Sequence, residues 1–158
     1  MNIGEVCSRE VYILKADEPL ATAVAEMLKR HIGAIVVVET EPDRVRPVGI
    51  VTDRDVIRGQ VSLKKDLPNL TLRHVMTHGP LCVSETCGIA EAIEHMRARG
   101  VRRAPVVNDS GDLVGIVSLD DLLPIVADEL GALARLVGNQ ASLEGRSTQP
   151  PTQSWPGA

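Results

Sequence analysis

One short pattern of chemically capable residues occurs twice in this chain, each time after a glycine and two apolar residues. Thr52 is followed three positions later by Asp55, and Ser118 by Asp121. A hydroxyl residue at the start of a helix can cap that helix or bond a ligand there, and the exposed amides favour anions. A carboxylate in the first turn can accept two hydrogen bonds from a vicinal diol, as a ribose requires. The alternative is an ordinary capping box, but the recurrence of the pattern favours the ligand interpretation.

The two patterns close the two halves of an internal duplication. Residues 5–38 align without a gap with residues 74–107, and residues 49–52 align with 115–118. The difference in length falls between these blocks, in a predicted turn, where insertions are tolerated. Such self-similarity predicts a repeat architecture, and each half is too small to bury a core by itself. We therefore expect the two halves to share a core.

Each half is predicted to contain a strand, a helix, two strands and a second helix. In the first half, residues 11–14, 34–38 and 48–51 form short apolar segments that suit strands. The apolar residues within 20–28 recur at helical spacing, and Asp17 is the expected N-cap of that helix. The predicted fold class is α/β (α+β), with two β-α-β-β-α repeats.

The predicted organisation has four parts: a first repeat at 2–60, a second at 70–125, a helical extension at 126–144 and a disordered tail at 145–158. The tail is assigned from its Ser, Thr, Gln, Pro and Gly residues, which show no periodicity. Apolar spacing continues from Leu122 to Val137, so the extension either completes the core or joins two copies of the chain. Pro124 would kink this helix or mark a restart.

Composition argues against several classes of function. The 158-residue chain is 44% hydrophobic, has a net charge of −4, and contains one Tyr, one Trp and no Phe. Negative charge and the lack of aromatic platforms argue against nucleic acid and anionic membranes as partners. No apolar stretch is long enough to span a bilayer, and the start lacks a secretory pattern. An odd number of cysteines fits reduced thiols, so we expect a cytoplasmic protein.

These residues together resemble the tandem cystathionine-β-synthase (CBS) domain pair. The resemblance is carried by residues 75–77, by the strand at 102–107 and by both Gly-Ile-Val-(Thr/Ser)-x-x-Asp motifs, and covers about residues 2–125. It implies two repeats packed with pseudo-two-fold symmetry around two clefts. These clefts would bind AMP, ADP, ATP or an S-adenosyl compound such as S-adenosylmethionine as a regulatory ligand. It also implies a free-standing regulatory module that forms a homodimer through its helices and acts on an unknown protein target.

The resemblance also assigns the ligand-binding residues. Asp55 and Asp121 would hold the ribose, with Thr52 and Ser118 as their hydroxyl partners. The strands ahead of these motifs would line the adenine, and the basic residues before them would hold phosphate. The other expected ligand-binding residues are Lys15, Ala34, Ile35, Arg102, Arg103, Ala104, Pro105 and Val106.

The two halves differ where phosphate binding is expected. The second half has Arg102-Arg103 where the first has Gly33-Ala34, and Val36 takes the place of Pro105. A guanidinium binds phosphate through two hydrogen bonds, whereas Gly and Ala offer no side-chain donor. The alternative is that the arginines are a solvated surface pair.

By the resemblance, each cleft also borrows the end of the first strand of the opposite repeat. The Asp121 cleft would receive residues 15–16 and the Asp55 cleft residues 84–85. We therefore expect the Asp121 cleft to take a phosphorylated adenosine. The Asp55 cleft is expected to be weaker, empty, or selective for a less anionic adenosyl ligand.

Other chemistries fit only parts of the chain. A zinc site could be imagined from His74, His78, Cys82 and Cys87. However, Cys82 aligns with apolar Ile13 in a predicted strand, so we expect no metal. No nucleophile elbow or triad supports a hydrolase, and the acids at the helix starts suit the helix dipole. We expect no catalytic residues and no required cofactor; the alternative function is a scaffold with degenerate clefts.

Overall fold

The computed structural model describes residues 1–64 and 66–147. These form two compact units, of which the first, Met1–Leu122, contains both halves of the duplication and the second begins at Leu123. Among the described helices, none is long and apolar enough to cross a membrane. Cys7, Cys82 and Cys87 are all free thiols.

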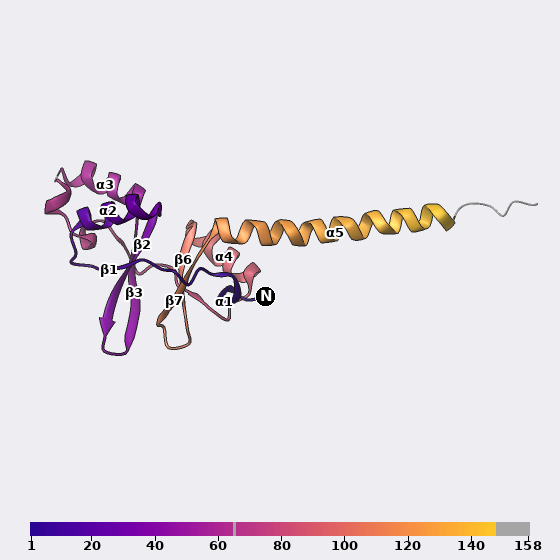
Figure 1. Ribbon diagram of the computed structural model, residues 1–158, viewed down its shortest axis with the longest axis horizontal. Helices are drawn as coiled ribbons and strands as arrows, with labels where there is room; N and C mark the ends of the chain where they lie inside the picture. Colours follow the sequence, from indigo (N-terminus) through magenta and orange to yellow (C-terminus); the bar gives the residue numbers. More distant parts are fainter. Residues whose placement is uncertain (65, 148–158) are drawn as a thin grey trace, which may run out of the picture. The chain divides into compact units, whose positions relative to one another are not determined.

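The first repeat forms a mixed four-stranded sheet in the order β1-β2-β3-β4 (Figure 1). Its strands are β1 (Ile13–Lys15), β2 (Ala34–Glu41), β3 (Arg44–Thr52) and β4 (Thr77–His78), and its helices are α2 (Leu20–Arg30) and α3 (Asp53–Leu63). β1 runs parallel to β2, and β2 and β3 form an antiparallel hairpin. β4 comes from the second half of the chain and pairs antiparallel with β3.

The second repeat forms a three-stranded sheet of order β5-β6-β7, which matches the β1-β2-β3 part of the first sheet. Its elements are β5 (Val83–Ser84), α4 (Ile89–Arg99), β6 (Arg103–Val107), β7 (Leu113–Ser118) and α5 (Leu119–Ser147). The short helix α1 (Ile3–Val6) lies at the start of the first half, and the 3-10 turns η1 (Leu67–Asn69) and η2 (Leu72–His74) lie between α3 and β4. The predicted strand–helix–strand–strand–helix order is therefore confirmed in both halves.

Two hydrophobic cores replace the single shared core that we expected. Each core is completed by a segment from the other half of the chain: Leu72 and Met76 lie in the first core, and Ile3 lies in the second. Backbone hydrogen bonds hold the exchanged segments, including a reciprocal pair between Ser8 and Ile116 at 2.9 Å in each direction. Because each half supplies part of the core of the other, neither repeat contains a complete core in its own sequence.

The exchange explains the glycine that begins each recurring motif. A β-carbon on Gly115 would lie 2.7 Å from the Cys7 sulfur and 2.8 Å from the Ser8 carbonyl oxygen. A β-carbon on Gly49 would lie 3.1 Å from Cγ of Met76. At Gly115 the neighbour includes backbone, so only a residue without a side chain leaves room there for the segment that crosses from the opposite half, whereas at Gly49 the neighbour is the flexible Met76 side chain.

Asp17 is not the N-cap of the first long helix, contrary to our prediction. Helix α2 begins at Leu20 after Pro19, which provides no side-chain cap. Asp17 instead accepts a hydrogen bond from Nε of Arg73 at 2.9 Å. The side chain therefore links the first repeat to the segment that enters the second.

The last helix runs without a break from Leu119 to Ser147, through Pro124. It joins the final helix of the second repeat to the predicted extension, so Pro124 does not mark a restart. Residues 145–147, which we assigned to a disordered tail, are helical. The rest of that predicted tail, residues 148–158, lies outside the described residues.

Candidate functional site

The two recurring motifs form the same hydrogen-bonded cap at the junction of a strand and a helix. In the first repeat, the Thr52 hydroxyl donates to Oδ2 of Asp55 at 2.6 Å, and this oxygen also accepts the Thr52 amide at 2.9 Å. In the second, the Ser118 hydroxyl and amide donate to Oδ2 of Asp121 at 2.7 and 2.8 Å. The capping interpretation is therefore correct at both sites, but each cap uses one carboxylate oxygen only.

The second carboxylate oxygen distinguishes the two aspartates. Oδ1 of Asp55 lies 3.8 Å from a terminal nitrogen of Arg58, one turn along α3. Within the described residues, Asp121 takes part in no ion pair. Oδ1 of Asp121 is thus an acceptor that a hydroxyl group of a ligand could use.

Asp121 and Ser118 line a cavity of about 810 Å³. The opposite wall comes from the first repeat, where Tyr12, Arg30 and Ala34 face the same space. This volume lies within the range of small-molecule sites. The cavity therefore combines a carboxylate from one repeat with an aromatic and a cationic side chain from the other.

Arg30 and Tyr12 form a fixed pair on the wall of this cavity. The Arg30 guanidinium lies 4.6 Å from the centre of the Tyr12 ring and donates to Glu26 at 2.8 Å. Partial desolvation, with Glu26 beside the ring, raises the pKa of Tyr12. The hydrogen bond to Glu26 raises the pKa of Arg30 further above its usual value. At neutral pH the wall consequently presents a neutral phenol and a charged guanidinium.

Thr52 and Asp55 line a second cavity of about 360 Å³. Four arginines border it: Arg54, Arg99, Arg102 and Arg103. Such a concentration of guanidinium groups favours an anion over a neutral or cationic ligand.

The structure places Arg102 at a different cavity from the one we expected. We expected both arginines of the second repeat to serve the Asp121 cleft, but Arg102 lines the Asp55 cavity only. Arg103 lines both cavities. The borrowed residues are also different from those expected, because neither 15–16 nor 84–85 lines either cavity.

Several other predicted site residues do not reach either cavity. Lys15 is exposed in β1, where its amide donates to Glu18. Ile35, Ala104 and Val106 are fully buried in the two cores. Successive side chains of a strand point to opposite faces of the sheet. On β2, Val36 therefore lines the larger cavity, whereas its neighbour Ile35 points into the core. Pro105 is buried and also lines neither cavity.

Sequence reasoning missed a symmetric pair of cavity residues. Arg30 ends α2 and lines the Asp121 cavity, and Arg99 ends α4 and lines the Asp55 cavity. The internal alignment pairs these two arginines with each other, which was the available signal. Each arginine lies in the same cavity as the aspartate of the opposite repeat, far away in the sequence. Spacing along the chain therefore gave no sign that the arginine and the aspartate share a cavity.

The zinc set considered from the sequence does not assemble. Nδ1 of His74 already accepts a hydrogen bond from the Thr71 amide, three residues earlier, at 3.0 Å. Among the described residues, the group with metal-binding spacing consists instead of Cys87, Glu91 and His95.

Comparison with known proteins agrees with this architecture. A family model described as CBS domain matches residues 3–62 and 72–128. An uncharacterized protein of Methanopyrus kandleri is 32% identical over 125 residues, which cover 79% of this chain and 62% of that protein. Inosine-5'-monophosphate dehydrogenase of Methanocaldococcus jannaschii is 34% identical over 119 residues, 75% of this chain and 22% of the enzyme. The chain therefore spans less than two thirds of the length of either relative.

Solved structures share the fold. A CBS domain protein from Pyrobaculum aerophilum complexed with AMP has a TM-score of 0.67 and 30% identity, over 77% of this chain and 89% of that one. A CBS domain pair in complex with 5'-methylthioadenosine and S-adenosyl-L-methionine has a TM-score of 0.71. At 20% identity, over 82% of this chain and 98% of that one, this second likeness shows the fold alone.

Proposed function

The chain belongs to the CBS domain family, and we propose that its paired repeats form a regulatory module that binds an adenosine-type nucleotide. The observation that carries the proposal is the position of Asp121. Its Oδ2 is used for the helix cap, while its carboxylate lines a cavity of about 810 Å³ that also contains Arg30 and Arg103. A carboxylate that accepts hydrogen bonds from the ribose hydroxyls and guanidinium groups that bind phosphate are what recognition of a nucleoside phosphate requires.

Each part of such a ligand has a complementary group in the larger cavity. The ribose diol can donate to Oδ1 of Asp121, and the phosphate can accept from the Arg103 guanidinium. The apolar walls, which include Val36 and Ile116, suit the adenine ring. The AMP complex of the Pyrobaculum relative supports this class of ligand. We propose AMP, ADP or ATP for the Asp121 cavity.

We propose weaker binding at the Asp55 cavity. This cavity has less than half the volume of the other, about 360 against 810 Å³. Arg58 lies beside the second oxygen of Asp55 and competes with a ribose for it. From the sequence we expected that this cavity could select a less anionic ligand, such as an S-adenosyl compound. The arginines that line it repel the cationic sulfonium of such a compound, so we propose that it binds poorly there.

We propose a regulatory role and no catalytic one. The match to inosine-5'-monophosphate dehydrogenase covers 22% of that enzyme, so it does not extend the activity of that enzyme to this chain. A ligand that binds one packing of the two repeats better than another shifts the population toward that packing. A protein target that recognises the selected packing would then receive the signal.

Isothermal titration calorimetry with AMP, ADP, ATP and S-adenosylmethionine tests the proposal. Asp121→Asn keeps an oxygen for the cap but removes the charge that accepts the ribose diol. We expect AMP affinity to fall by about tenfold to a hundredfold, the usual effect of losing a hydrogen bond to a charged group. Asp120→Asn is the matched control, because Asp120 is a neighbouring exposed carboxylate that lines neither cavity.

Two outcomes would contradict the proposal. Equal losses in the Asp121 and Asp120 variants would show that the effect is general electrostatics. No binding of any adenosyl compound, together with no rise in melting temperature, would favour the scaffold alternative, because a ligand of the native state must stabilise it.

A further inference from the structure

We propose that Cys87, Glu91 and His95 form a binding site for a divalent transition-metal ion of the Zn²⁺ class. The Cys87 sulfur, a Glu91 carboxylate oxygen and a His95 ring nitrogen all lie within 4.8 Å of one another. The site is separate from both nucleotide cavities, and none of its residues lines either of them.

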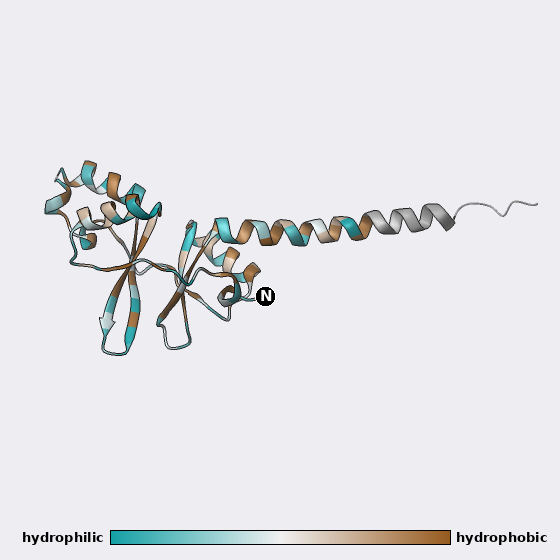
Figure 2. Cartoon of the chain, in the orientation of Figure 1, coloured by the Kyte–Doolittle hydropathy of each residue, from teal (hydrophilic) through white to brown (hydrophobic). Residues whose placement is uncertain are grey.

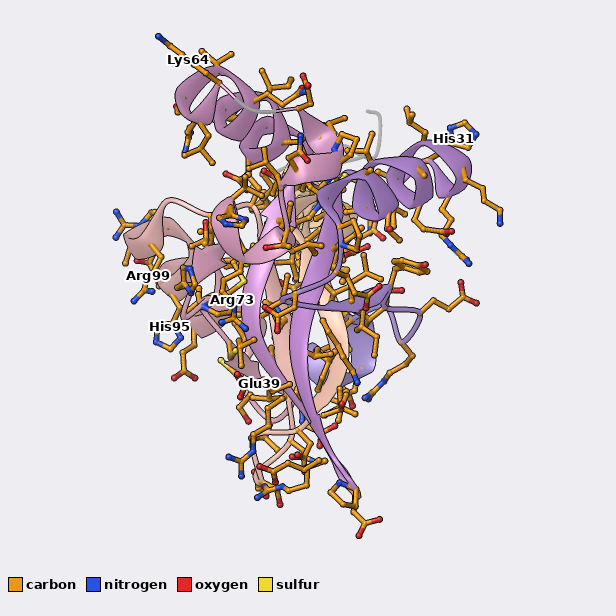
Figure 3. The ribbon with its side chains drawn as sticks, turned by 90° about the vertical axis from the view of Figure 1, so that its left-hand side faces the viewer. His31, Glu39, Lys64, Arg73, His95 and Arg99 are labelled. Atoms are coloured by element: carbon orange, nitrogen blue, oxygen red, sulfur yellow. The ribbon has the colours of Figure 1, made fainter. Side chains whose placement is uncertain are left out.

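The turn before α4 and the helix itself bring the three side chains together. Cys87 precedes Gly88, the N-cap, and the other two residues follow at intervals of four. Residues four apart lie on the same face of a helix. Ala92 and Met96 are buried on the core side, whereas Glu91 and His95 are exposed. Figure 3 shows the His95 ring on the outer side of the molecule, near Arg99 of the same helix.

Of the three ligands, Cys87 has a backbone held in place by hydrogen bonds, whereas Glu91 and His95 have exposed side chains that can rotate. Cys87 is half-buried, and its backbone amide donates to Ser84 at 3.0 Å while its carbonyl accepts from Ile3 at 2.9 Å. Tetrahedral zinc with bonds of 2.0–2.3 Å places its ligand atoms about 3.3–3.8 Å apart. The ligand atoms lie within 4.8 Å of one another, so rotation of the exposed Glu91 and His95 side chains would have to bring them closer by up to about 1–1.5 Å.

The donor set selects the kind of ion. A thiolate and an imidazole suit Zn²⁺ and Co²⁺, whereas Mg²⁺ and Ca²⁺ prefer oxygen ligands. Thiolate and carboxylate together neutralise the two charges of the ion, and water completes the fourth position.

A bound ion would act on the exchanged N-terminal segment. The turn that contains Cys87 accepts the amide of Ile3, and Glu85 accepts the amide of Gly4 at 2.8 Å. An ion that joins this turn to α4 stiffens the surface on which the segment docks. We therefore expect metal to stabilise the second repeat whether or not a nucleotide is bound.

Titration of the untagged, reduced full chain with Co²⁺ tests the site, because cobalt reports a thiolate ligand by a charge-transfer band in the near ultraviolet. We expect one equivalent of Co²⁺ to produce this band and Zn²⁺ to displace it. Cys87→Ser should abolish the band. His95→Ala should weaken Zn²⁺ binding by at least about tenfold, since even groups behind the ligands have effects of this size.

Cys82→Ser and His78→Ala are the matched controls, with the same residue types outside the group. Both should retain the band and the affinity for Zn²⁺. The proposal is overturned if saturating Co²⁺ gives no thiolate band, or if Cys82→Ser abolishes it and Cys87→Ser does not. It is also overturned if Zn²⁺ raises the melting temperature of His95→Ala as much as that of the wild type. AMP binding measured in parallel separates these outcomes from a failure of the nucleotide proposal.

Discussion

The guanidinium of Arg103, in the second repeat, lies against Gly33 of the first repeat. A β-carbon on Gly33 would lie 3.6 Å from one terminal nitrogen of Arg103 and 3.7 Å from the other. The same point is 3.7 Å from a carboxylate oxygen of Asp53. Arg103 lines both cavities, and the duplication places uncharged Ala34 at the equivalent position of the first repeat. A single guanidinium therefore borders both cavities.

Arg103→Gln is expected to weaken nucleotide binding at both cavities. The loss should be about tenfold to a hundredfold, as for other hydrogen bonds to charged groups. Arg102→Gln should affect only the Asp55 cavity. Calorimetry with AMP in Asp55→Asn and Asp121→Asn backgrounds measures each cavity by itself. An Arg102 effect confined to the Asp121 cavity would restore the assignment we first made from the sequence.

Gly115→Ala is expected to destabilise the first unit by about 1–3 kcal/mol, the usual cost of overpacking. The added methyl group would meet the Cys7 sulfur and the Ser8 backbone, so the exchanged segment must move. Urea unfolding followed by circular dichroism gives the change in free energy. Gly33→Ala is the control, because its methyl group has no neighbour closer than 3.6 Å. Equal midpoints for the two variants would show that the segment yields without cost.

Asp17→Asn is expected to lower stability at neutral pH and to have no effect in strong acid. The hydrogen bond from Arg73 lowers the pKa of Asp17. A carboxylate whose pKa is lowered in the folded protein stabilises the fold at pH values above its pKa in the unfolded chain, which is about 3.9. This stabilisation is lost as the pH falls through the pKa of the folded protein. The pair is exposed, so the difference is small and should shrink in 1 M salt. Urea midpoints of variant and wild type, compared from pH 7 down to pH 2, check the sign; a difference that grows in acid would contradict it.

We propose that α2 and α3 form the homodimer interface that the family resemblance implies. Leu28, Ile57 and Val61 are 73%, 65% and 73% exposed, and Figure 2 shows apolar residues along α3. Exposed apolar side chains on neighbouring helices favour a protein interface. Val61→Glu should convert a dimer to a monomer in light scattering after size-exclusion chromatography. Leu130→Glu, on α5, is the control; if it alone gives the monomer, the C-terminal helix joins the copies instead.

The sequence predicted the recurring elements well because their signals are local. Alternation, helical spacing and the Thr52 and Ser118 caps depend on residues only a few positions apart, and all are present in the structure. The Asp17 cap failed for a long-range reason, since Arg73 binds that carboxylate from beyond the first repeat. Arg30 was missed because it shares a cavity with Asp121, which belongs to the other half of the chain.

The duplication, the family and the two strand-to-helix motifs with their aspartates can be read directly from the order of residues. Which side chains share a cavity with each aspartate depends on the packing of the two repeats. The cores exchange segments, and each cavity combines residues from both repeats, so Arg102 lies with Asp55 and Arg30 with Asp121. The physical reason is that spacing along a chain specifies local backbone geometry, whereas contacts across an approximate two-fold axis depend on how complete sheets pack.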